Sequence, residues 1–392
     1  MRVRRRAQHH VHLRDVRAHS DLYTILFLIS DTGAGHRSAA SAIAKALSLV
    51  YEQSHANGQP TPDMDCHIVD AFAECARFPL HKTVSFYGPV TRHSPRLYGH
   101  VFHATNSAER FNTVRQLCQP FLLQGLRALI ARIRPDVIVS VHPLLNHVTL
   151  QALDQMGLRV PVITVVTDLV NAHASWFARG VDACIVPTQA VKSLALAHGL
   201  AATRVHLLGM PVDPCFAVCP TATVAERRSA LALDADLPVA LLTGGGEGGC
   251  DLAEAVEEIV RQRLRVQLLV VAGRNRQLYA RVERMRWQHD TPTRISLFGF
   301  VRNMPDLMRA ADVIVTKAGP GTISEAVACK LPIVLLGAIP GQEEGNIDFV
   351  LQNGLGVLAP TPENLALHLA NLLDASHPQH GQIRARARAI NR

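Results

Sequence analysis

The sequence predicts an α/β fold of two doubly wound domains in series. Short apolar runs alternate with helix-length segments, which is typical of parallel sheets buried on both faces. The alternation breaks near residue 210 and restarts, and the length of 392 residues exceeds that of one ordinary domain. The hydrophobic fraction of 48% and the charged fraction of 18% indicate a large packed core.

The apolar runs predict strands in two sets. The first set is Thr24–Ser30, His67–Val69, Val137–Val141, Val162–Thr167, Ala183–Val186 and Val205–Leu208. The second set is Val239–Thr243, Gln267–Ala272, Ile295–Phe298, Val313–Thr316 and Ile333–Leu336. Ligands of doubly wound sheets bind beyond the carboxyl ends of the strands, so we expect the functional residues there.

These sets predict the domain organisation. Residues 1–20 are expected to form a disordered basic tail, not a signal peptide, because no cleavage site precedes the first strand. We predict a first domain at 21–210 with an insertion at about 71–121, a Pro-containing linker at 211–220, a second domain at 221–375 and a basic C-terminal segment at 376–392.

The formal net charge of +8 is concentrated at the two ends of the chain. Residues 1–20 carry a net +5 and residues 381–392 a net +4, which leaves −1 for the remainder. A nucleic-acid-binding protein should line one folded face with basic residues, so we predict no nucleic-acid partner. The basic ends suit attraction to an anionic membrane surface; the open alternative is that they are solvated and without function.

The insertion at 71–121 contains no clear strand but holds eight of the 19 aromatic residues. Helices carrying these side chains, with Arg77, Lys82, Arg92 and Arg96 between them, could lie in a bilayer interface. An ordinary helical insertion with a small core of its own explains the composition equally well.

Composition supports neither a metal site nor a disulfide framework. The eight cysteines form no Cys-x-x-Cys pair and the 20 histidines show no ligand spacing. Asp63-Met64-Asp65 matches a manganese-binding Asp-x-Asp pattern but is predicted to lie in a Pro-rich loop. We therefore expect no metal, no other cofactor and a reducing cytosol as the surroundings of the protein.

The first predicted strand ends in Ser30-Asp31-Thr32-Gly33-Ala34-Gly35-His36-Arg37-Ser38, before an alanine-rich helix over Ala39–Leu49. Its glycines allow the backbone to approach a ligand at the helix N-terminus. A dinucleotide fold is disfavoured because the nearest candidate acid, Asp70, lies too far along the chain. A helix N-terminus disfavours charged His36, so this residue is a candidate base; capping of the turn is the alternative.

Two more strand ends of the first set carry polar residues. Asp168 follows Val162–Thr167 and should face the same cleft. There it orients a base or binds a hydroxyl, unless it only caps the following helix. His142 follows Val137–Val141 in the same way.

Glycine-rich turns also follow strands of the second set. Residues 243–249 (Thr-Gly-Gly-Gly-Glu-Gly-Gly) suit backbone approach to a phosphate, and no Walker loop is present because Gly-Lys-Ser/Thr does not follow. A Gly-Pro-Gly turn at 319–321 precedes a helix whose N-terminus can bind a diphosphate. Glu325 lies one turn further on, where a carboxylate can accept both ribose hydroxyls. Pro340–Asn346 offers amides and carboxylates to sugar hydroxyls.

Taken in this order, the segments resemble the GT-B glycosyltransferases of family 28, in particular the monogalactosyldiacylglycerol synthase and processive diacylglycerol glucosyltransferase family. They are Ser30–Ser38, Val141–Leu145, Val166–Phe177, Gly244–Gly248, Ala272–Asn275, Gly299–Val301, Thr316–Ala326 and Pro340–Asn346. The resemblance implies two doubly wound, Rossmann-like domains that face each other across a cleft. It also implies inverting transfer of a hexose from a UDP-sugar to diacylglycerol at a membrane. Val166–Phe177 and Gly341–Asn346 look closer to the galactolipid synthases, which favours galactose over glucose.

The resemblance also implies residue roles. His36 and Asp168 are the catalytic candidates, and the residues implied on the acceptor side are Gly35, His142, Tyr87, Tyr98 and Trp176. Uracil would be held by 299–301 near Arg274, diphosphate by 319–322, ribose by Glu325, and hexose by Gln342, Glu343 and Asn346. The implied donor-binding set is Gly244, Gly245, Gly246, Glu247, Gly248, Arg274, Gly299, Phe300, Val301, Lys317, Ala318, Gly319, Pro320, Gly321, Thr322, Glu325, Gln342, Glu343 and Asn346.

Two alternatives stay open from the sequence. One is another enzyme on the same fold, either an N-acetylglucosaminyl transferase acting on a lipid-linked cell-wall precursor or a UDP-sugar epimerase. The other is a non-catalytic membrane-associated sensor that uses the UDP pocket. For the leading interpretation we expect a monotopic cytoplasmic protein, peripheral on the inner face of the cell membrane, since no apolar run approaches the roughly 20 residues of a membrane span.

Overall fold

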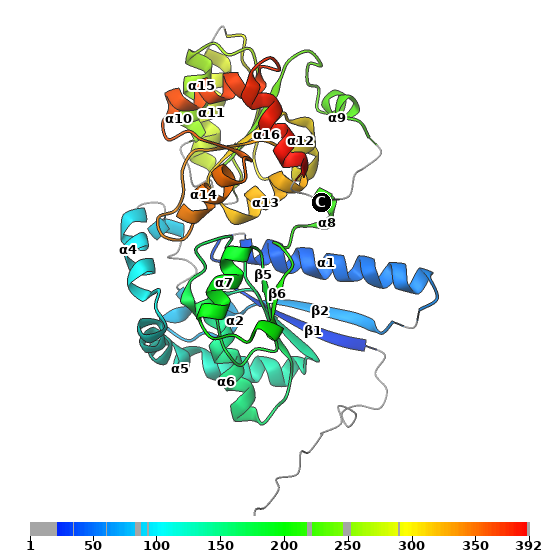
Figure 1. Ribbon diagram of the computed structural model, residues 1–392, viewed down its shortest axis with the longest axis vertical. Helices are drawn as coiled ribbons and strands as arrows, with labels where there is room; N and C mark the ends of the chain where they lie inside the picture. Colours follow the sequence, from blue (N-terminus) through cyan, green and yellow to red (C-terminus); the bar gives the residue numbers. More distant parts are fainter. Residues whose placement is uncertain are drawn as a thin grey trace, which may run out of the picture.

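The computed structural model describes residues 22–33, 35–59, 61–82, 88–91, 94–217, 222–245, 252–288 and 291–389. Two lobes stand one above the other, each built on a six-stranded parallel sheet (Figure 1). This confirms the predicted α/β fold with two doubly wound sheets. The predicted tail at 1–20 lies outside the described residues, and the predicted domain bounds stay a prediction.

The first lobe has the strand order β2-β1-β3-β4-β5-β6. Its strands are β1 (Leu22–Ile29), β2 (Asp63–Asp70), β3 (Val137–Ser140), β4 (Val162–Val165), β5 (Ala183–Val186) and β6 (Val205–Leu207). Its helices are α1 (Gly35–Ala56), α2 (Ala71–Cys75), α4 (Pro95–Thr105), α5 (Ala108–Ile133), α6 (Asn146–Met156) and α7 (Gln189–Ala197). Single 3₁₀ turns are η1 (Leu80–Lys82), η2 (Pro143–Leu145), η3 (Ala174–Trp176) and η4 (Ala202–Arg204).

The side chains of β1 show why this sheet is buried on both faces. Leu26 and Leu28 belong to a core cluster with residues of α5 and α6, whereas Ile25 and Phe27 pack in another cluster with residues of α1. Successive side chains of a strand point to opposite faces, so a continuous apolar run fits a strand covered by helices on both sides.

The second lobe has the strand order β12-β11-β10-β7-β8-β9. Its strands are β7 (Val239–Thr243), β8 (Gln267–Val271), β9 (Arg294–Phe298), β10 (Val313–Thr316), β11 (Ile333–Leu335) and β12 (Gly356–Leu358). Its helices are α9 (Val224–Ala230), α10 (Leu252–Arg261), α11 (Arg276–Gln288), α12 (Met304–Ala310), α13 (Pro320–Ala328), α14 (Glu344–Gln352), α15 (Pro362–Leu373) and α16 (Pro378–Ala389). Helix α8 (Pro214–Ala217) lies between the lobes and contacts α1 and α13, and its Phe216 packs in a core cluster of the second lobe.

The structure corrects two features of the predicted strand pattern. Strand β12 was not expected, because its three residues are too short to show a period. Strand β2 begins at Asp63, so Asp63-Met64-Asp65 lies in a strand and not in a loop. Its parallel pairing with β1, from Leu22 opposite Asp63 to Ile29 opposite Asp70, explains the extension.

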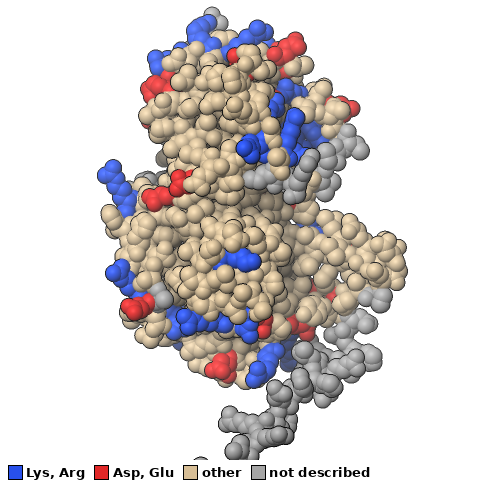
Figure 2. Space-filling view, viewed as in Figure 1, with Lys and Arg blue, Asp and Glu red and all other residues tan. Residues whose placement is uncertain are grey.

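The basic C-terminal segment is part of the second lobe as far as it is described. Ile383 and Ala387 of α16 are buried, and the guanidinium of Arg384 lies 3.4 Å from a carboxylate oxygen of Asp312. On the face shown in Figure 2, Lys and Arg side chains are dispersed over both lobes and form no continuous band.

The described part of the insertion is helical and packs closely on the first lobe. Gly125 of α5 lies so near α2 that a Cβ built on it would be 2.1 Å from the carbonyl oxygen of Cys75. Such a contact is far below van der Waals distance, so only glycine allows these two helices to meet in this way.

We predict that Gly125→Ala destabilises the protein, although Ala normally favours a helix over Gly by about 0.5–1 kcal/mol. The overpacking should lower the free energy of unfolding by about 1–3 kcal/mol in a urea titration. Gly381→Ala in α16 is the control, because a Cβ there meets nothing within 4 Å. Equal stability of the two variants would contradict the close packing of α2 on α5.

Candidate functional site

The polar residues at the ends of β1, β3 and β4 meet at one edge of the first sheet. These strands are neighbours and parallel, so their carboxyl ends share that edge. The rings of His36 and His142 lie 4.8 Å apart between centroids in an edge-to-face arrangement. His36 Nδ1 lies 3.3 Å from the hydroxyl oxygen of Thr167, the last residue before Asp168.

His36 is held in its neutral form. It is the second residue of α1, is partly buried, and its ring lies 6.2 Å from that of Trp176. Burial lowers the pKa of His36 to about 4, against smaller opposing effects of a backbone hydrogen bond to Val141 and the charge of Asp31. A Cβ built on Gly35 meets nothing within 4 Å, so there is open space beside this histidine. At neutral pH the imidazole can therefore accept a proton.

Asp168 is buried and bonded to both lobes. Its Oδ2 accepts a hydrogen bond of 2.6 Å from the indole N–H of Trp176, and its Oδ1 accepts one of 3.2 Å from the amide of Gln342. Burial raises the pKa of Asp168 to about 6, although both of these donors lower it. The hydrogen bonds described for His36 lead to Thr167 and the Val141 backbone, whereas those of Asp168 lead to Trp176 and Gln342. Asp168 can therefore act on the site through Trp176 and Gln342.

The second lobe brings the Gly-rich turns and Lys317 together. Lys317 Nζ donates a hydrogen bond of 2.5 Å to Glu343 Oε1, and a Cβ built on Gly319 would lie 3.7 Å from Nζ. Gly245 has a φ of +76°, which favours glycine, and lies beside the same lysine. Gly246, Glu247 and Gly248 lie outside the described residues.

Helix α13 begins immediately after this cluster. Gly319 occupies the N-cap position and Pro320 the first turn, and a Cβ built on Gly321 would meet nothing within 4 Å. Ala318 is buried, and Thr322 lies in the first turn. The amide N–H groups of the first turn have no partner within the helix, so this end can bind an anion.

The loop between β11 and α14, residues 336–343, with the first turn of α14, holds the three residues implied for the hexose. The side chains of Glu343 and Asn346 are buried and form hydrogen bonds within the second lobe. Glu343 Oε2 accepts a hydrogen bond of 3.0 Å from the Ile339 amide, and Asn346 Nδ2 donates one of 2.8 Å to the Ala318 carbonyl. Gln342 instead reaches the first lobe, where its Oε1 accepts a hydrogen bond of 2.8 Å from the Tyr98 hydroxyl.

The residues implied for the nucleoside lie at the ends of β8, β9 and within α13. The guanidinium of Arg274 stacks 5.1 Å from the ring centroid of Phe300, which is exposed. Gly299 and Val301 flank this ring in the chain. Glu325 is partly buried, and burial together with the charge of Asp213 raises its pKa to about 7.

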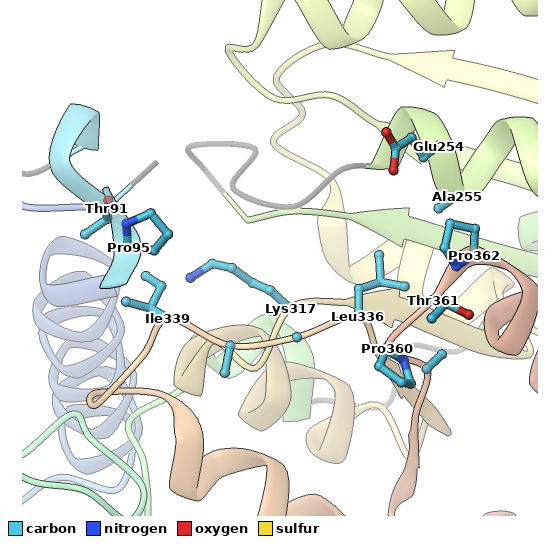
Figure 3. A pocket seen from close by; sticks show the side chains of 13 residues that line it. Thr91, Pro95, Glu254, Ala255, Lys317, Leu336, Ile339, Pro360, Thr361 and Pro362 are labelled. Atoms are coloured by element: carbon cyan, nitrogen blue, oxygen red, sulfur yellow. The ribbon is translucent and has the colours of Figure 1, made fainter. Parts of the chain in front are cut away.

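A cavity of about 320 Å³ opens where the lobes meet (Figure 3). Thr91 and Pro95 of the first lobe form one wall, and the side chain of Lys317 points into it from the second lobe (Figure 3). Neither wall residue of the first lobe was expected from the sequence. Thr91 and Pro95 line the cavity because the insertion packs against the second lobe, and this contact is visible only in the structure.

The remaining predicted site residues are only partly placed. Tyr87 lies outside the described residues, whereas Tyr98 lies on α4 and forms a hydrogen bond to Gln342 of the second lobe. Among the described residues, no group of three or more His, Cys, Asp or Glu side chains could hold a metal ion. The expected absence of a cofactor stays a prediction.

Comparison with known proteins decides the family. The family described as "Monogalactosyldiacylglycerol (MGDG) synthase" matches residues 36–212, and "Glycosyltransferase family 28 C-terminal domain" matches residues 239–346. "Probable monogalactosyldiacylglycerol synthase 2, chloroplastic" of Oryza sativa subsp. indica is 36% identical over 88% of this chain and 72% of its own length. The chain belongs to the monogalactosyldiacylglycerol synthase family. "Monogalactosyldiacylglycerol synthase 3, chloroplastic" of Arabidopsis thaliana is similar at 34% identity over 89% of this chain and 74% of its own length.

Solved structures agree with the GT-B fold of this synthase family. MurG of Acinetobacter baumannii has a TM-score of 0.55 at 14% identity, covering 93% of this chain and 94% of that chain. A UDP-GlcNAc 2-epimerase of Neisseria meningitidis, bound to UDP-GlcNAc, has a TM-score of 0.55 at 12% identity, covering 94% of this chain and 98% of its own. These identities show the fold alone. The choice among enzymes rests on the synthase relatives, which favour neither the epimerase nor the cell-wall transferase.

The relatives overturn one prediction. They are named as chloroplastic plant proteins, so the inner face of a cell membrane was wrong as the expected location. The cysteine pattern that suggested a cytosolic protein reports only reducing conditions and does not distinguish one compartment from another. No described helix combines the length and hydrophobicity of a membrane span.

The buried histidines make the stability of this synthase depend on pH. Burial, with a smaller effect of His36, holds the pKa of His142 well below 6.5. The unfolded chain therefore takes up a proton at His142 below about pH 6.5 that the folded protein does not bind. Because the unfolded state then binds more protons, stability falls as the pH decreases through this range.

We predict that His142→Asn weakens this pH dependence. Between about pH 6.5 and 5, the free energy of unfolding should fall by about 2 kcal/mol less than in the wild type, given about 1.4 kcal/mol per pH unit for one proton. Urea titrations at several pH values measure it, with exposed His206→Asn as the control. A pH dependence in His142→Asn equal to that of the wild type would refute the argument.

Proposed function

We propose that this chain transfers galactose from UDP-galactose to the free hydroxyl of diacylglycerol, with inversion at the anomeric carbon. The observation that carries the proposal is a neutral histidine at the start of α1, beside Gly35, whose Cβ would meet nothing within 4 Å, on a helix that contacts α13 of the second lobe. The relatives named as monogalactosyldiacylglycerol synthases support the choice of donor and acceptor.

In this proposal His36 is the general base. It removes the proton from the lipid hydroxyl, and the oxygen attacks the anomeric carbon from the face opposite the diphosphate. The new carbon–oxygen bond forms as the bond to UDP breaks, and the bond's electron pair leaves with the diphosphate. Burial supports the assignment because it keeps the imidazole unprotonated before reaction.

Backbone amides and one lysine stabilise the leaving diphosphate. The first turn of α13 supplies amide N–H groups next to Gly319 and Gly321, and Lys317 supplies a positive charge beside them. Such preoriented donors stabilise developing negative charge without reorganising during the reaction. That no metal takes part belongs to this proposal.

The remaining donor contacts follow the same arrangement. Arg274 and Phe300, with the neighbouring backbone, would hold the uracil, and Glu325 would accept the ribose hydroxyls. The β11–α14 loop would contact the hexose. Asp168 would act as a positioning residue, since it binds Trp176 and Gln342.

We predict that His36→Ala lowers kcat by about 10²–10⁴-fold, the usual contribution of general base catalysis, and leaves the Kd for UDP within about twofold. Galactose transfer to diacylglycerol vesicles gives kcat, and calorimetry gives the Kd. His55→Ala, at the far end of the same helix, is the control. If UDP binding collapsed while turnover per bound donor stayed normal, His36 would be a donor ligand and the assignment would be wrong.

A membrane-facing surface completes the proposal. Leu97 and Val101 of α4, one turn apart, and Leu117 of α5 are more than half exposed. Both helices lie on the same side of the molecule (Figure 1). Exposed apolar side chains on these two helices, with the exposed Arg96 next to Leu97 in the chain, suit an interfacial position where the lipid acceptor is found.

We predict that the double variant Leu97→Ser/Val101→Ser binds anionic vesicles at least about tenfold more weakly, because two side chains no longer transfer into the apolar interface. Vesicle sedimentation measures the change. Leu351→Ser/Leu367→Ser removes two exposed leucines of the second lobe and should leave binding unchanged. Equal losses in the two variants would show that α4 is not the docking element.

A further inference from the structure

The β11–α14 loop is held between two parts of the first lobe. On one side α4 packs against it so closely that a Cβ on Gly99 would lie 2.8 Å from Pro340 Cβ. On the other side Asn171 Nδ2 donates a hydrogen bond of 3.0 Å to the Gly341 carbonyl. In Figure 1, α4 rises from the first lobe to the level of α14. Figure 3 shows Pro95 of α4 and Ile339 of this loop on the same side of the cavity.

Within this contact the amide of Gln342 is oriented from both ends. The Tyr98 hydroxyl donates a hydrogen bond to its Oε1 at 2.8 Å, and its Nε2 donates one to Asp168 Oδ1 at 3.2 Å. Asp168 is fixed in turn by the indole N–H of Trp176 at 2.6 Å. The chain of hydrogen bonds therefore runs from Trp176 through Asp168 and Gln342 to Tyr98.

The two bonds specify which end of the amide is which. An amide presents an acceptor oxygen and a donor NH₂ that are nearly equal in size, so only hydrogen bonding distinguishes its two orientations. Tyr98 lies on α4, one position from the exposed Leu97, and its bond reaches across to the other lobe. Without the hydroxyl, the hydrogen bond to Oε1 that crosses from the first lobe is lost.

We propose that Tyr98 is a positioning residue that fixes the Gln342 amide and thereby determines which hexose the donor site accepts. The inference rests on the proposed function, in which the β11–α14 loop contacts the sugar. A fixed amide offers a donor and an acceptor in defined places to the hexose hydroxyls. Epimeric hexoses differ in the direction of one hydroxyl. An amide held in one orientation therefore discriminates between them better than an amide that can rotate between its two orientations.

Tyr98→Phe tests the proposal because it removes the hydroxyl and keeps the ring. Calorimetry should show that UDP-galactose binds about 5–20-fold more weakly, whereas UDP, which has no hexose, binds within about twofold of the wild type. The ratio of kcat/KM for UDP-galactose to that for UDP-glucose should fall by a similar factor, with the KM for diacylglycerol unchanged.

Two further variants make the test specific. Tyr51→Phe removes a hydroxyl that bonds to Asp63 far from the loop, and it should bind both nucleotides as the wild type does. Gln342→Ala should weaken UDP-galactose at least as much as Tyr98→Phe, and the double variant should show no additional loss, because both changes act on one interaction.

The inference is overturned if Tyr98→Phe binds UDP-galactose as the wild type does, or if UDP weakens equally, which would indicate a purely structural role. These results are distinct from failure of the proposed function. A wild-type protein that binds UDP-galactose but transfers nothing to diacylglycerol would refute the proposed reaction, while the difference in donor binding would still support the role of Tyr98.

Discussion

The close contact of the β11–α14 loop with the first lobe is the constraint on which the site depends. Glycines make it possible, because a Cβ on Gly341 would lie 2.9 Å from Phe102 and a Cβ on Gly345 would lie 2.7 Å from Asn171. A protein interior packed as closely as this contact has low compressibility, so the two lobes cannot shift at this point without disrupting the packing. In the proposed reaction, this contact fixes how the first turn of α13 lies relative to His36.

Burial dominates the electrostatics of this closed region. It lowers the pKa of His36 to about 4 and raises those of Asp168 and Glu325 to about 6 and 7, so each shift favours the neutral form. Removing water in this way strengthens the remaining dipoles and charges, including the α13 amides and Lys317. A UDP-sugar entering the cleft would find His36 already unprotonated and the amide donors of the first turn of α13 already oriented toward its diphosphate.

The sequence was sufficient to predict both sheets and the residues at the strand ends, because buried parallel strands appear as apolar runs and their polar ends cluster at one edge. The local sequence pattern of hydrophobic and polar residues does not predict which residues of one lobe contact the other. Tyr98 and Gln342 are far apart in the chain and meet only through the packing of α4, and Thr167, the partner of His36, was overlooked beside the more conspicuous Asp168. Strand β12 was missed because three residues show no period.

A crystal structure of the protein with UDP-galactose would test the central claim most directly, namely that the two lobes hold the nucleotide between α13 and His36. The account predicts the diphosphate at the first turn of α13, the uracil near Phe300 and the anomeric carbon with its open face toward His36. A nucleotide bound elsewhere, or a sugar whose anomeric carbon is turned away from His36, would contradict it.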